Sequence, residues 1–350
     1  MRIHLILIAL IAMLTFGCQK ETEEFEELNE ETTASPVAGK PNCTGNFWTL
    51  DNPFYPGRCS DALNDIPPLV YNNKVYVFHP VYPGSQGQVD VKVYDGINWT
   101  NIMSTVPDAY PLCHAYFGFT IGNKGYLVSP SATFEYSFEA NTWALMDGFP
   151  GGYRTHAATF SIGSKGYIVG GSSVTSSTIN YYDTWEFNPA LNDWTQKASL
   201  PRGAARTATG FSIGNKGYIV NGFNKNGNTV VYLKDLFEYD PVPDEWNYKT
   251  FFPGNSRKNT SVFVIGGAAY AGGGYGTEAP NPYNTFNDFY KYTPSNNSWQ
   301  QVADLSPFDV KDPSKYGFTL NNNGYVAFIN HTSDPDYMLK YTPKICIVPF

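Results

Sequence analysis

The stretch "SIGSKGYIVGG" at residues 161–171 is repeated almost letter for letter at residues 212–222, as "SIGNKGYIVNG". A third copy, "TIGNKGYLV", occupies residues 120–128, and looser versions stand at residues 72–78, 264–274 and 321–328. A chain that repeats one motif every few tens of residues stacks copies of one supersecondary unit. Each copy is predicted to be the second strand of such a unit, preceded by a tight turn.

Two aromatic landmarks set the size of the unit. The tyrosine after the glycine turn recurs at intervals of 50, 41, 51, 52 and 55 residues, at Tyr76, Tyr126, Tyr167, Tyr218, Tyr270 and Tyr325. A tryptophan falls between or after these tyrosines, at Trp99, Trp143, Trp194, Trp246 and Trp299. Three of the tryptophans lie five residues after a proline, as in "EFNPALNDW" at 186–194. The pattern predicts four antiparallel strands per unit, with the tyrosines and tryptophans in the core between neighbouring sheets.

These features resemble the kelch-repeat β-propeller family over about residues 43–350. The resemblance rests on the aromatic landmarks and on the glycine pairs Gly170–Gly171, Gly266–Gly267 and Gly272–Gly274. The phrases "GNKGYI" and "FEYDP" are similar to those of the kelch proteins common in Bacteroidetes. In such a propeller the four-stranded sheets stack radially, because a single sheet of this size cannot bury both of its faces.

The two ends of the chain determine how the ring closes. The last unit contains Tyr341 and Pro343, but Val348 stands where the tryptophan is expected. The N-terminal segment "CTGNFW" ends in Trp48, which has no unit before it. Tyrosine and tryptophan strands pair completely only if Trp48 joins the last sheet. We therefore predict an all-β, six-bladed kelch-type β-propeller in which an N-terminal strand completes the last blade.

Composition agrees with this fold and limits the function. Aromatic residues make up 16% of the 350 residues and charged residues only 15%, with 32 glycines and 25 prolines. This composition suits short strands and tight turns rather than helices. The formal net charge of −8 argues against a nucleic-acid partner, because phosphates are bound by clustered Lys and Arg.

The first 42 residues are predicted to direct export. Arg2 precedes an apolar run at 3–16, which is too short to span a bilayer as a helix. The run ends in "LTFGC", which resembles the lipobox of bacterial lipoproteins and implies removal of residues 1–17 and lipidation of Cys18. An ordinary cleaved signal peptide is the alternative. Residues 18–42 are acidic and lack periodicity, so a disordered tether is expected. The acidic residues after Cys18 resemble the export signal of Bacteroidetes surface lipoproteins and imply an outer-membrane, surface-exposed protein.

Four further cysteines permit two disulfide bonds in an exported protein. Cys43 precedes Trp48 by five residues, and Cys346 follows Pro343 by three, so ring closure brings both to the same strand end. We predict that Cys43 and Cys346 form a disulfide that locks the ring. Cys59 and Cys113 both precede first strands of adjacent blades, and a second disulfide between them is possible.

Long loops and recurring basic residues define the candidate binding surface. The long loops at 79–90, 172–183, 223–235 and 275–288 open on one face of the predicted ring, and the last of them contains Tyr275 and Tyr283. Such loops on a rigid scaffold suit a recognition surface. The segments that lead into the first strands hold Arg58, His114, Arg154, His156, Arg202, Arg206 and Arg257. These arginines either bind a carboxylate at the mouth of the central channel or hold loop carbonyls at the entry to each blade.

Enzyme signatures are scarce in the sequence. The histidines show no metal-ligand spacing, and neither a nucleophile elbow nor a phosphate-binding loop is present. We therefore expect a non-catalytic, monomeric binding scaffold for a glycan or protein partner, without cofactor or metal. The alternative is an envelope carbohydrate enzyme similar to the six-bladed kelch sialic-acid mutarotases, with His156 and either Arg154 or Arg206 at the channel mouth.

Overall fold

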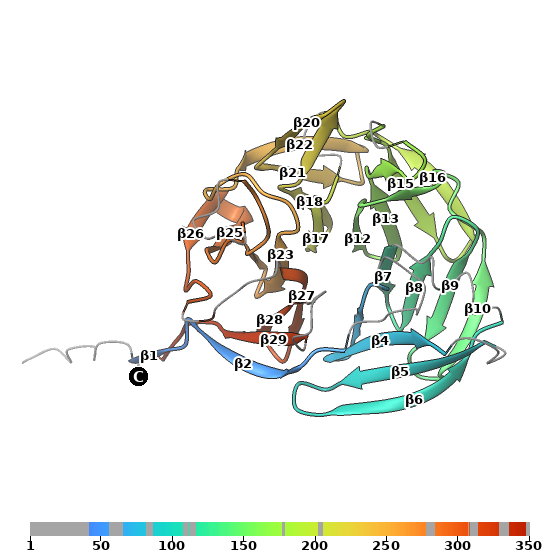
Figure 1. Cartoon of the computed structure of the whole chain (residues 1–350), viewed down its shortest axis with the longest axis horizontal. Coiled ribbons are helices and arrows are strands. Elements are labelled where there is room, and N and C mark those ends of the chain that lie inside the picture. The colour runs from blue at the N-terminus through green and yellow to red at the C-terminus, as the bar shows by residue number, and fades with distance from the viewer. Residues whose placement is uncertain are drawn as a thin grey trace, which may run out of the picture. The chain divides into compact units, whose positions relative to one another are not determined.

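Six four-stranded antiparallel sheets stand around a common centre in the computed structural model (Figure 1). The structure describes residues 42–55, 66–81, 87–107, 112, 117–176, 179–201, 206–277, 284–306, 308, 314–328 and 336–347. Residues 43–346 form one compact unit. The predicted six-bladed β-propeller is confirmed.

The blades are numbered in chain order, and each runs from an inner first strand to an outer fourth strand. Blade 1 contains β3 (Leu69–Tyr71), β4 (Lys74–Pro80), β5 (Gln88–Tyr94) and β6 (Trp99–Thr105). Blade 2 contains β7 (Phe117–Ile121), β8 (Lys124–Val128), β9 (Thr133–Ser137) and β10 (Thr142–Met146). Blade 3 contains β12 (Ala158–Ile162), β13 (Lys165–Val169), β15 (Thr184–Asn188) and β16 (Asp193–Lys197).

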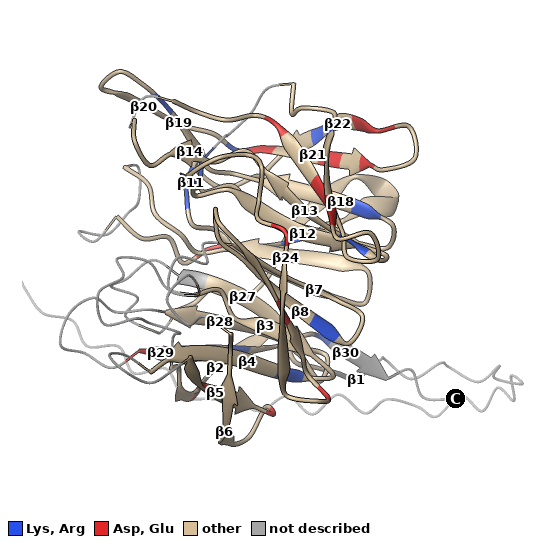
Figure 2. Cartoon of the chain, turned by 90° about the vertical axis from the view of Figure 1, so that its right-hand side faces the viewer, with Lys and Arg blue, Asp and Glu red and all other residues tan. Residues whose placement is uncertain are grey.

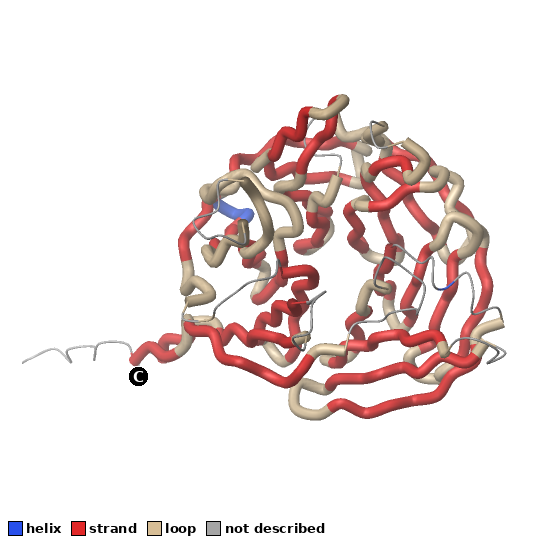
Figure 3. Tube along the Cα trace, viewed as in Figure 1, coloured by secondary structure: helices blue, strands red, loops and turns tan. Residues whose placement is uncertain are grey.

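Blade 4 contains β17 (Thr209–Ile213), β18 (Lys216–Val220), β21 (Asp235–Asp240) and β22 (Glu245–Phe251). Blade 5 contains β23 (Ser261–Ile265), β24 (Ala268–Gly272), β25 (Phe289–Thr293) and β26 (Ser298–Gln301). A short 3-10 helix, η2 (Pro294–Asn296), forms the turn between β25 and β26. Strands and their connecting loops follow one another around the whole ring (Figure 3). No helix in the described ranges is long and apolar enough to cross a membrane.

Blade 6 is built from both ends of the chain, as the sequence predicts. It contains β27 (Ser314–Leu320), β28 (Asn323–Phe328) and β29 (Tyr337–Thr342), and its outer strand is β2 (Phe47–Pro53). Trp48 is buried opposite Tyr341, and its indole Nε1 donates to the carbonyl of Ala303 in the blade 5 exit. The N-terminal strand therefore closes the ring by taking the position of a fourth strand.

A second strand pair lies beyond this closure. β1 (Asn42–Thr44) pairs with β30 (Ile345–Ile347), and each strand has three residues. In the adjoining pair Phe47 lies opposite Thr342. If that antiparallel register continues outward, Cys43 is opposite Cys346. Directly opposed residues in antiparallel strands have Cα atoms about 4.5–5.5 Å apart, which lies within the range that a disulfide spans. The Cys43–Cys346 bond itself stays a prediction.

The opening sequence motif is explained by the position of its residues in blade 3. Gly163 turns the chain between β12 and β13 with φ +57°, a conformation that favours glycine. β13 has buried residues on both faces, so its apolar run is continuous, whereas β12 alternates between buried and partly exposed residues. Tyr167 in β13 is buried and donates to Glu186 at 2.6 Å, and burial raises the pKa of this tyrosine.

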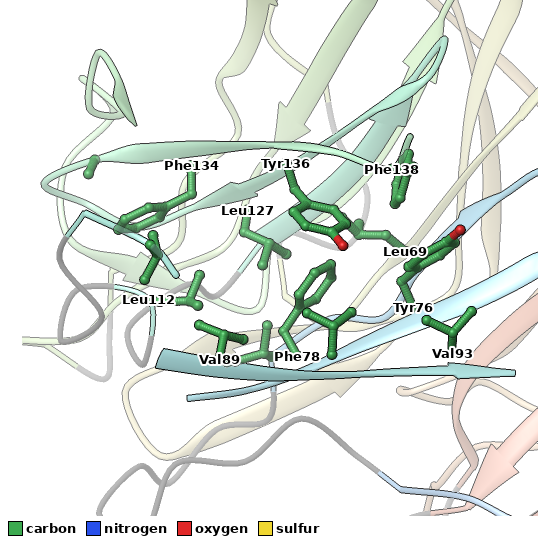
Figure 4. Close-up of a cluster of buried hydrophobic side chains, with 14 residues drawn as sticks. Leu69, Tyr76, Phe78, Val89, Val93, Leu112, Leu127, Phe134, Tyr136 and Phe138 are labelled. Atoms are coloured by element: carbon green, nitrogen blue, oxygen red, sulfur yellow. The ribbon is translucent and has the colours of Figure 1, made fainter. Parts of the chain in front are cut away.

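The core lies between neighbouring blades, where the repeated aromatic residues pack. Figure 4 shows the cluster between blades 1 and 2, in which Tyr76 and Phe78 of β4 face Tyr136 of β9 and Phe138, the residue after that strand. The ring centroids of Phe78 and Tyr136 are 5.2 Å apart in an edge-to-face contact. The predicted structural role of the repeated tyrosines is confirmed, since all six are buried.

The turn before each fourth strand links one blade to the previous one. Four of these turns end in a residue with positive φ whose side chain accepts from a buried tyrosine hydroxyl, namely Asn46, Asn141, Asp244 and Asn297. The same side chains bond the exit of the preceding blade, as Asn46 does with the N–H of Ala303. Asn46 thus accepts from the tyrosine hydroxyl of blade 6 as Asn297 does in blade 5.

Candidate functional site

A cavity of about 410 Å³ lies at the centre of the ring. It is lined by the inner strands and by the segments that enter them, including Val70, Gly118, Thr159, Gly210, Val262 and Gly317. These six residues come from blades 1 to 6 in order, so a residue with a side chain alternates with a glycine from one blade to the next. A Cβ atom at Gly210 would lie 2.4 Å from the carbonyl oxygen of Thr159, and one at Gly317 would lie 2.3 Å from that of Val262. Glycine at these positions lets adjacent inner strands approach closely.

The entry segments of blades 3, 4 and 5 share one backbone arrangement at the rim of this cavity. In blade 3, β11 (Arg154–Thr155) pairs with β14 (Ser172–Ser173). In blade 4, Arg206 forms a β-bridge with Phe223 of the hairpin strand β19 (Phe223–Asn226), and in blade 5 Lys258 forms one with Tyr275. Thr155, Arg206 and Lys258 therefore occupy equivalent positions. The arginines of the sequence pattern are not all equivalent.

The residue after each of these positions has a left-handed backbone. The φ angle is +62° at His156, +48° at Thr207 and +55° at Asn259, and all three residues line the cavity. A β-branched residue with positive φ is rare, because its side chain crowds the backbone. Such strain is found at functional sites, where the surrounding structure enforces it. The Thr207 hydroxyl is buried and makes no hydrogen bond to the described residues.

His156 has a defined hydrogen-bonding environment at the rim. Its side chain is exposed, and its Nδ1 lies 2.9 Å from Thr155 Oγ1 and 3.5 Å from Ser172 Oγ. These hydroxyls fix the orientation of the imidazole ring. The described lining of the cavity contains the imidazole of His156 and no carboxylate.

Arg206 and Lys258 place two cations around one aromatic ring at the mouth of the cavity. The guanidinium carbon of Arg206 lies 5.9 Å from the ring centroid of Phe223, and Nζ of Lys258 lies 5.5 Å from the same centroid. Lys258 Nζ is also 4.9 Å from the ring centroid of Tyr275. Within the described part of the chain, no carboxylate lies within ion-pair distance of Lys258, and burial lowers the pKa of this lysine.

Arg206 is held in place by neutral groups of the blade 3 loop. Its Nε donates to Asn180 Oδ1 at 2.6 Å, and its Nη2 donates to the carbonyl of Ile179 at 3.0 Å. The side chain is buried, and burial lowers the pKa of its guanidinium. These contacts orient the guanidinium of Arg206. Arg206 and Lys258 thus place two basic side chains at the rim between blades 4 and 5.

Arg154 and Arg257 have a different role. Both are almost completely buried, and each forms a two-pronged ion pair, with Asp183 and Asp288 respectively, at 2.5 and 2.9 Å. Both also donate to backbone carbonyls, including those of Gly170 and Gly273. Each guanidinium lies over aromatic rings, Phe149 and Tyr181 in one case and Phe252 and Phe286 in the other. These are the contacts of residues that hold the blade entry, and both guanidinium groups are engaged by an aspartate.

The remaining predicted site residues are distributed as follows. Tyr275 lies in its β-bridge beneath Lys258, next to the rim. Arg58, His114, Arg202 and Tyr283 lie outside the described residues, as do Cys18, Cys59 and Cys113. Among the described residues no group of three His, Cys, Asp or Glu side chains is arranged to hold a metal ion. Sequence analysis missed Phe223, Lys258, Thr207 and Asn259. The β-bridges of the structure align Thr155, Arg206 and Lys258 in the segments "YRTH", "ARTA" and "SRKN", a register that the recurring arginine hides in the sequence.

The fold and these repeated blades define a six-bladed β-propeller with a kelch motif. The kelch motif model matches residues 256–306, from the entry segment of blade 5 to its exit. The solved structure titled "Structure of YjhT" matches with a TM-score of 0.51 and 19% identity, covering 60% of this chain and 70% of that one. At this identity the structural match supports the fold alone.

Two groups of curated proteins are similar over parts of the chain. An N-acetylneuraminate epimerase from Salmonella arizonae is 35% identical over 97 residues, which are 27% of this chain and 24% of the relative. The N-acetylneuraminate epimerase from Pasteurella multocida is 30% identical over 136 residues, covering 39% and 34%. Beta-scruin from Limulus polyphemus is 25% identical over 163 residues, covering 43% and 17%. The matched stretches thus span about a third or less of these relatives.

Proposed function

We propose that this propeller is a non-catalytic binding protein that holds the carboxylate of an acidic sugar or glycan on its long-loop face, at the mouth of the central cavity. The observation that carries the proposal is the pair Arg206 and Lys258 around Phe223, beside a polar cavity. Cations bind carboxylates by charge-assisted hydrogen bonds, and hydroxyl and amide side chains bind sugar hydroxyls. The cavity volume of about 410 Å³ is in the usual range for small-molecule sites.

The lining supports binding better than catalysis. Acid–base chemistry on a sugar needs one group that donates a proton and another that accepts it, both within hydrogen-bond reach. The described lining supplies His156 and no carboxylate. The other polar groups there are threonine hydroxyls, the amide of Asn259 and the phenol of Tyr316, so the described lining lacks the paired carboxylates that acid–base chemistry often uses.

The experiment that tests this proposal is calorimetric titration with N-acetylneuraminate and glucuronate, compared with the neutral sugars N-acetylglucosamine and glucose. We expect the acids to bind and the neutral sugars to bind at least about tenfold more weakly, because a charge-assisted hydrogen bond contributes roughly 1.5–3 kcal/mol. Lys258→Met should remove the preference for acids and Lys258→Arg should retain it. Lys234→Met, which changes an exposed lysine nearby, should have no effect. Equal affinity for acids and neutral sugars, or no binding of any of them, would reject the proposal.

Affinity should also depend on pH in a defined direction. Burial lowers the pKa of Lys258 in the free protein, and a bound carboxylate favours the charged amine. Affinity for the acidic sugar is therefore full at pH values below the lowered pKa of Lys258. It falls as the pH rises through that pKa, which lies below the ordinary lysine value of about 10.4. Lys258→Arg should shift this loss to higher pH, because arginine stays charged.

A second candidate is an envelope carbohydrate enzyme that interconverts sugar anomers. The similarity to N-acetylneuraminate epimerases favours it. In this case His156, oriented by Thr155, would transfer the proton, and Arg206 rather than Arg154 would hold the carboxylate, because Arg154 is occupied by Asp183. NMR exchange spectroscopy on N-acetylneuraminate tests it. Anomer exchange that is accelerated by the wild type but not by His156→Ala would show that the protein is an enzyme. Binding without acceleration would support the non-catalytic binding protein.

The proposed location of the protein rests on its N-terminal sequence. We propose that Cys18 is lipidated and that the propeller is displayed at the outer membrane. A surface location would give the long-loop face access to glycans outside the cell.

A further inference from the structure

A separate hairpin stands on the long-loop face beside the cation pair. It consists of β19 (Phe223–Asn226) and β20 (Thr229–Tyr232), which pair with one another as a two-stranded sheet. Figure 2 shows the hairpin at the outer end of the long-loop side, away from the short turns of the blades. The inner strand β19 is bridged to Arg206, whereas in the described part of the chain no strand pairs with the far edge of β20.

The register shows which backbone groups face that edge. The N–H of Leu233 donates to the carbonyl of Gly222, and Val231 lies opposite Asn224 in the same hydrogen-bonded phase. Hydrogen-bonded and open pairs alternate in an antiparallel ladder, so Val230 and Tyr232 direct their N–H and C=O groups away from β19. Phe223, opposite Tyr232, directs its own groups outward and exchanges both hydrogen bonds with Arg206, as this phase requires. β20 thus presents an unpaired strand edge.

The side chains on this edge do not protect it. Val230 and Val231 are 43% and 49% exposed, and β20 contains neither a proline nor a charged residue. Natural proteins usually block exposed edges with such residues, because a bare edge accepts strands from other chains. An exposed β-branched strand edge is the surface that strand addition uses, with the backbone supplying the hydrogen bonds.

Charge determines the kind of partner. The hairpin and the segment after it, residues 223–234, contain Lys225 and Lys234 and no acidic residue, although the whole chain carries a net charge of −8. Lys234 is exposed. A second copy of the chain would bring these lysines against their own counterparts. An acidic strand would complement them.

We propose that β20 binds an extended, acidic segment of another protein by strand addition. The bound segment would pair its backbone with Val230 and Tyr232, and its acidic side chains would lie near Lys225 and Lys234. This site is distinct from the sugar site, because it uses the outer edge of the hairpin whereas the cation pair lies at the inner strand.

The test uses a synthetic peptide of about eight alternating glutamate and valine residues, the length of an ordinary strand, labelled with fluorescein. Fluorescence anisotropy should show binding, and the same peptide with lysine in place of glutamate should bind at least about tenfold more weakly. Val230→Pro removes one outward N–H without removing a hairpin hydrogen bond, since proline is tolerated at edge positions of this kind. It should abolish binding, whereas Val230→Thr should retain it. Lys225→Gln combined with Lys234→Gln should remove the preference for glutamate, and Lys258→Met should change nothing.

Three results would overturn the proposal. One is unchanged peptide binding by Val230→Pro when NMR shows the hairpin intact. Another is absence of binding at concentrations up to about 1 mM, which corresponds to about −4 kcal/mol. The third is a dimer in sedimentation velocity that dissociates in Val230→Pro, which would assign the edge to a second copy of the chain.

Discussion

Replacing Asp288 by Asn should destabilise the propeller by about 3 kcal/mol. Its carboxylate pairs with Arg257, a side chain with 0% exposure, through two hydrogen bonds of 2.5 and 2.9 Å. Removing one partner of a buried ion pair costs roughly 3–5 kcal/mol, because the remaining charge is left uncompensated. We take the lower end since the Asp288 side chain is 25% exposed and the amide of Asn retains one acceptor. For about 300 residues this corresponds to a fall in Tm of roughly 5 °C.

Urea denaturation followed by tryptophan fluorescence measures this cost, and calorimetry measures the shift in Tm. Asp183→Asn in blade 3 should give a similar loss, because Arg154 has the same contacts. Asp193→Asn, at an exposed position, should stay within about 0.5 kcal/mol of the wild type. Acidic-sugar binding by the folded Asp288→Asn variant should be unchanged. A loss of stability under about 1 kcal/mol, or an Arg257→Met variant of normal stability that no longer binds sugar, would refute a structural role for these arginines.

Two further predictions concern ring closure and backbone strain. Cys43→Ser should lower stability by about 2–4 kcal/mol under oxidising conditions and have little effect under reducing ones, since a bond across roughly 300 residues constrains the unfolded chain strongly; peptide mapping without reductant that finds both Cys43 and Cys346 as free thiols would contradict it. Thr207→Gly should raise the free energy of unfolding by up to about 1 kcal/mol. Glycine relieves a left-handed conformation that costs other residues roughly 1–2 kcal/mol, and the greater entropy that glycine loses on folding offsets part of this gain. The same variant should weaken sugar binding in titration, because glycine loosens the backbone that lines the cavity. A destabilised variant with normal affinity would show that the strain at Thr207 serves no site.

The fold could be predicted from the sequence because each blade repeats the same packing problem. The motif "SIGSKGYIVGG" fixes an inner turn, a strand buried on both faces and a core tyrosine, and every copy needs the same residues. The closure by Trp48 could be predicted because a missing tryptophan at one end matched an extra one at the other. These signals are local in sequence and recur several times.

The site could be predicted only in part, because its members differ from blade to blade. Arginine recurs before three inner strands, but in the structure Arg154 and Arg257 are one residue out of phase with Arg206. The sequence pattern therefore grouped the buried arginines Arg154 and Arg257, here called the two clamps, with Arg206 at the rim, and it overlooked Lys258. The aspartates that neutralise the clamps follow about 30 residues later, after loops of unequal length. No local pattern connects them to their arginines.

The two clamps explain how blade 4 can hold a strained threonine at the cavity. The N–H of Thr207 donates to the carbonyl of His156, in the segment that Arg154 fixes. On the other side, the N–H of Gly222 donates to the carbonyl of Arg257, the second clamp. A strained backbone persists only where its surroundings over-determine it, and here the strained entry segment lies between two neighbours held by buried ion pairs. Arg154 and Arg257 therefore hold the backbone on both sides of the strained entry segment of blade 4.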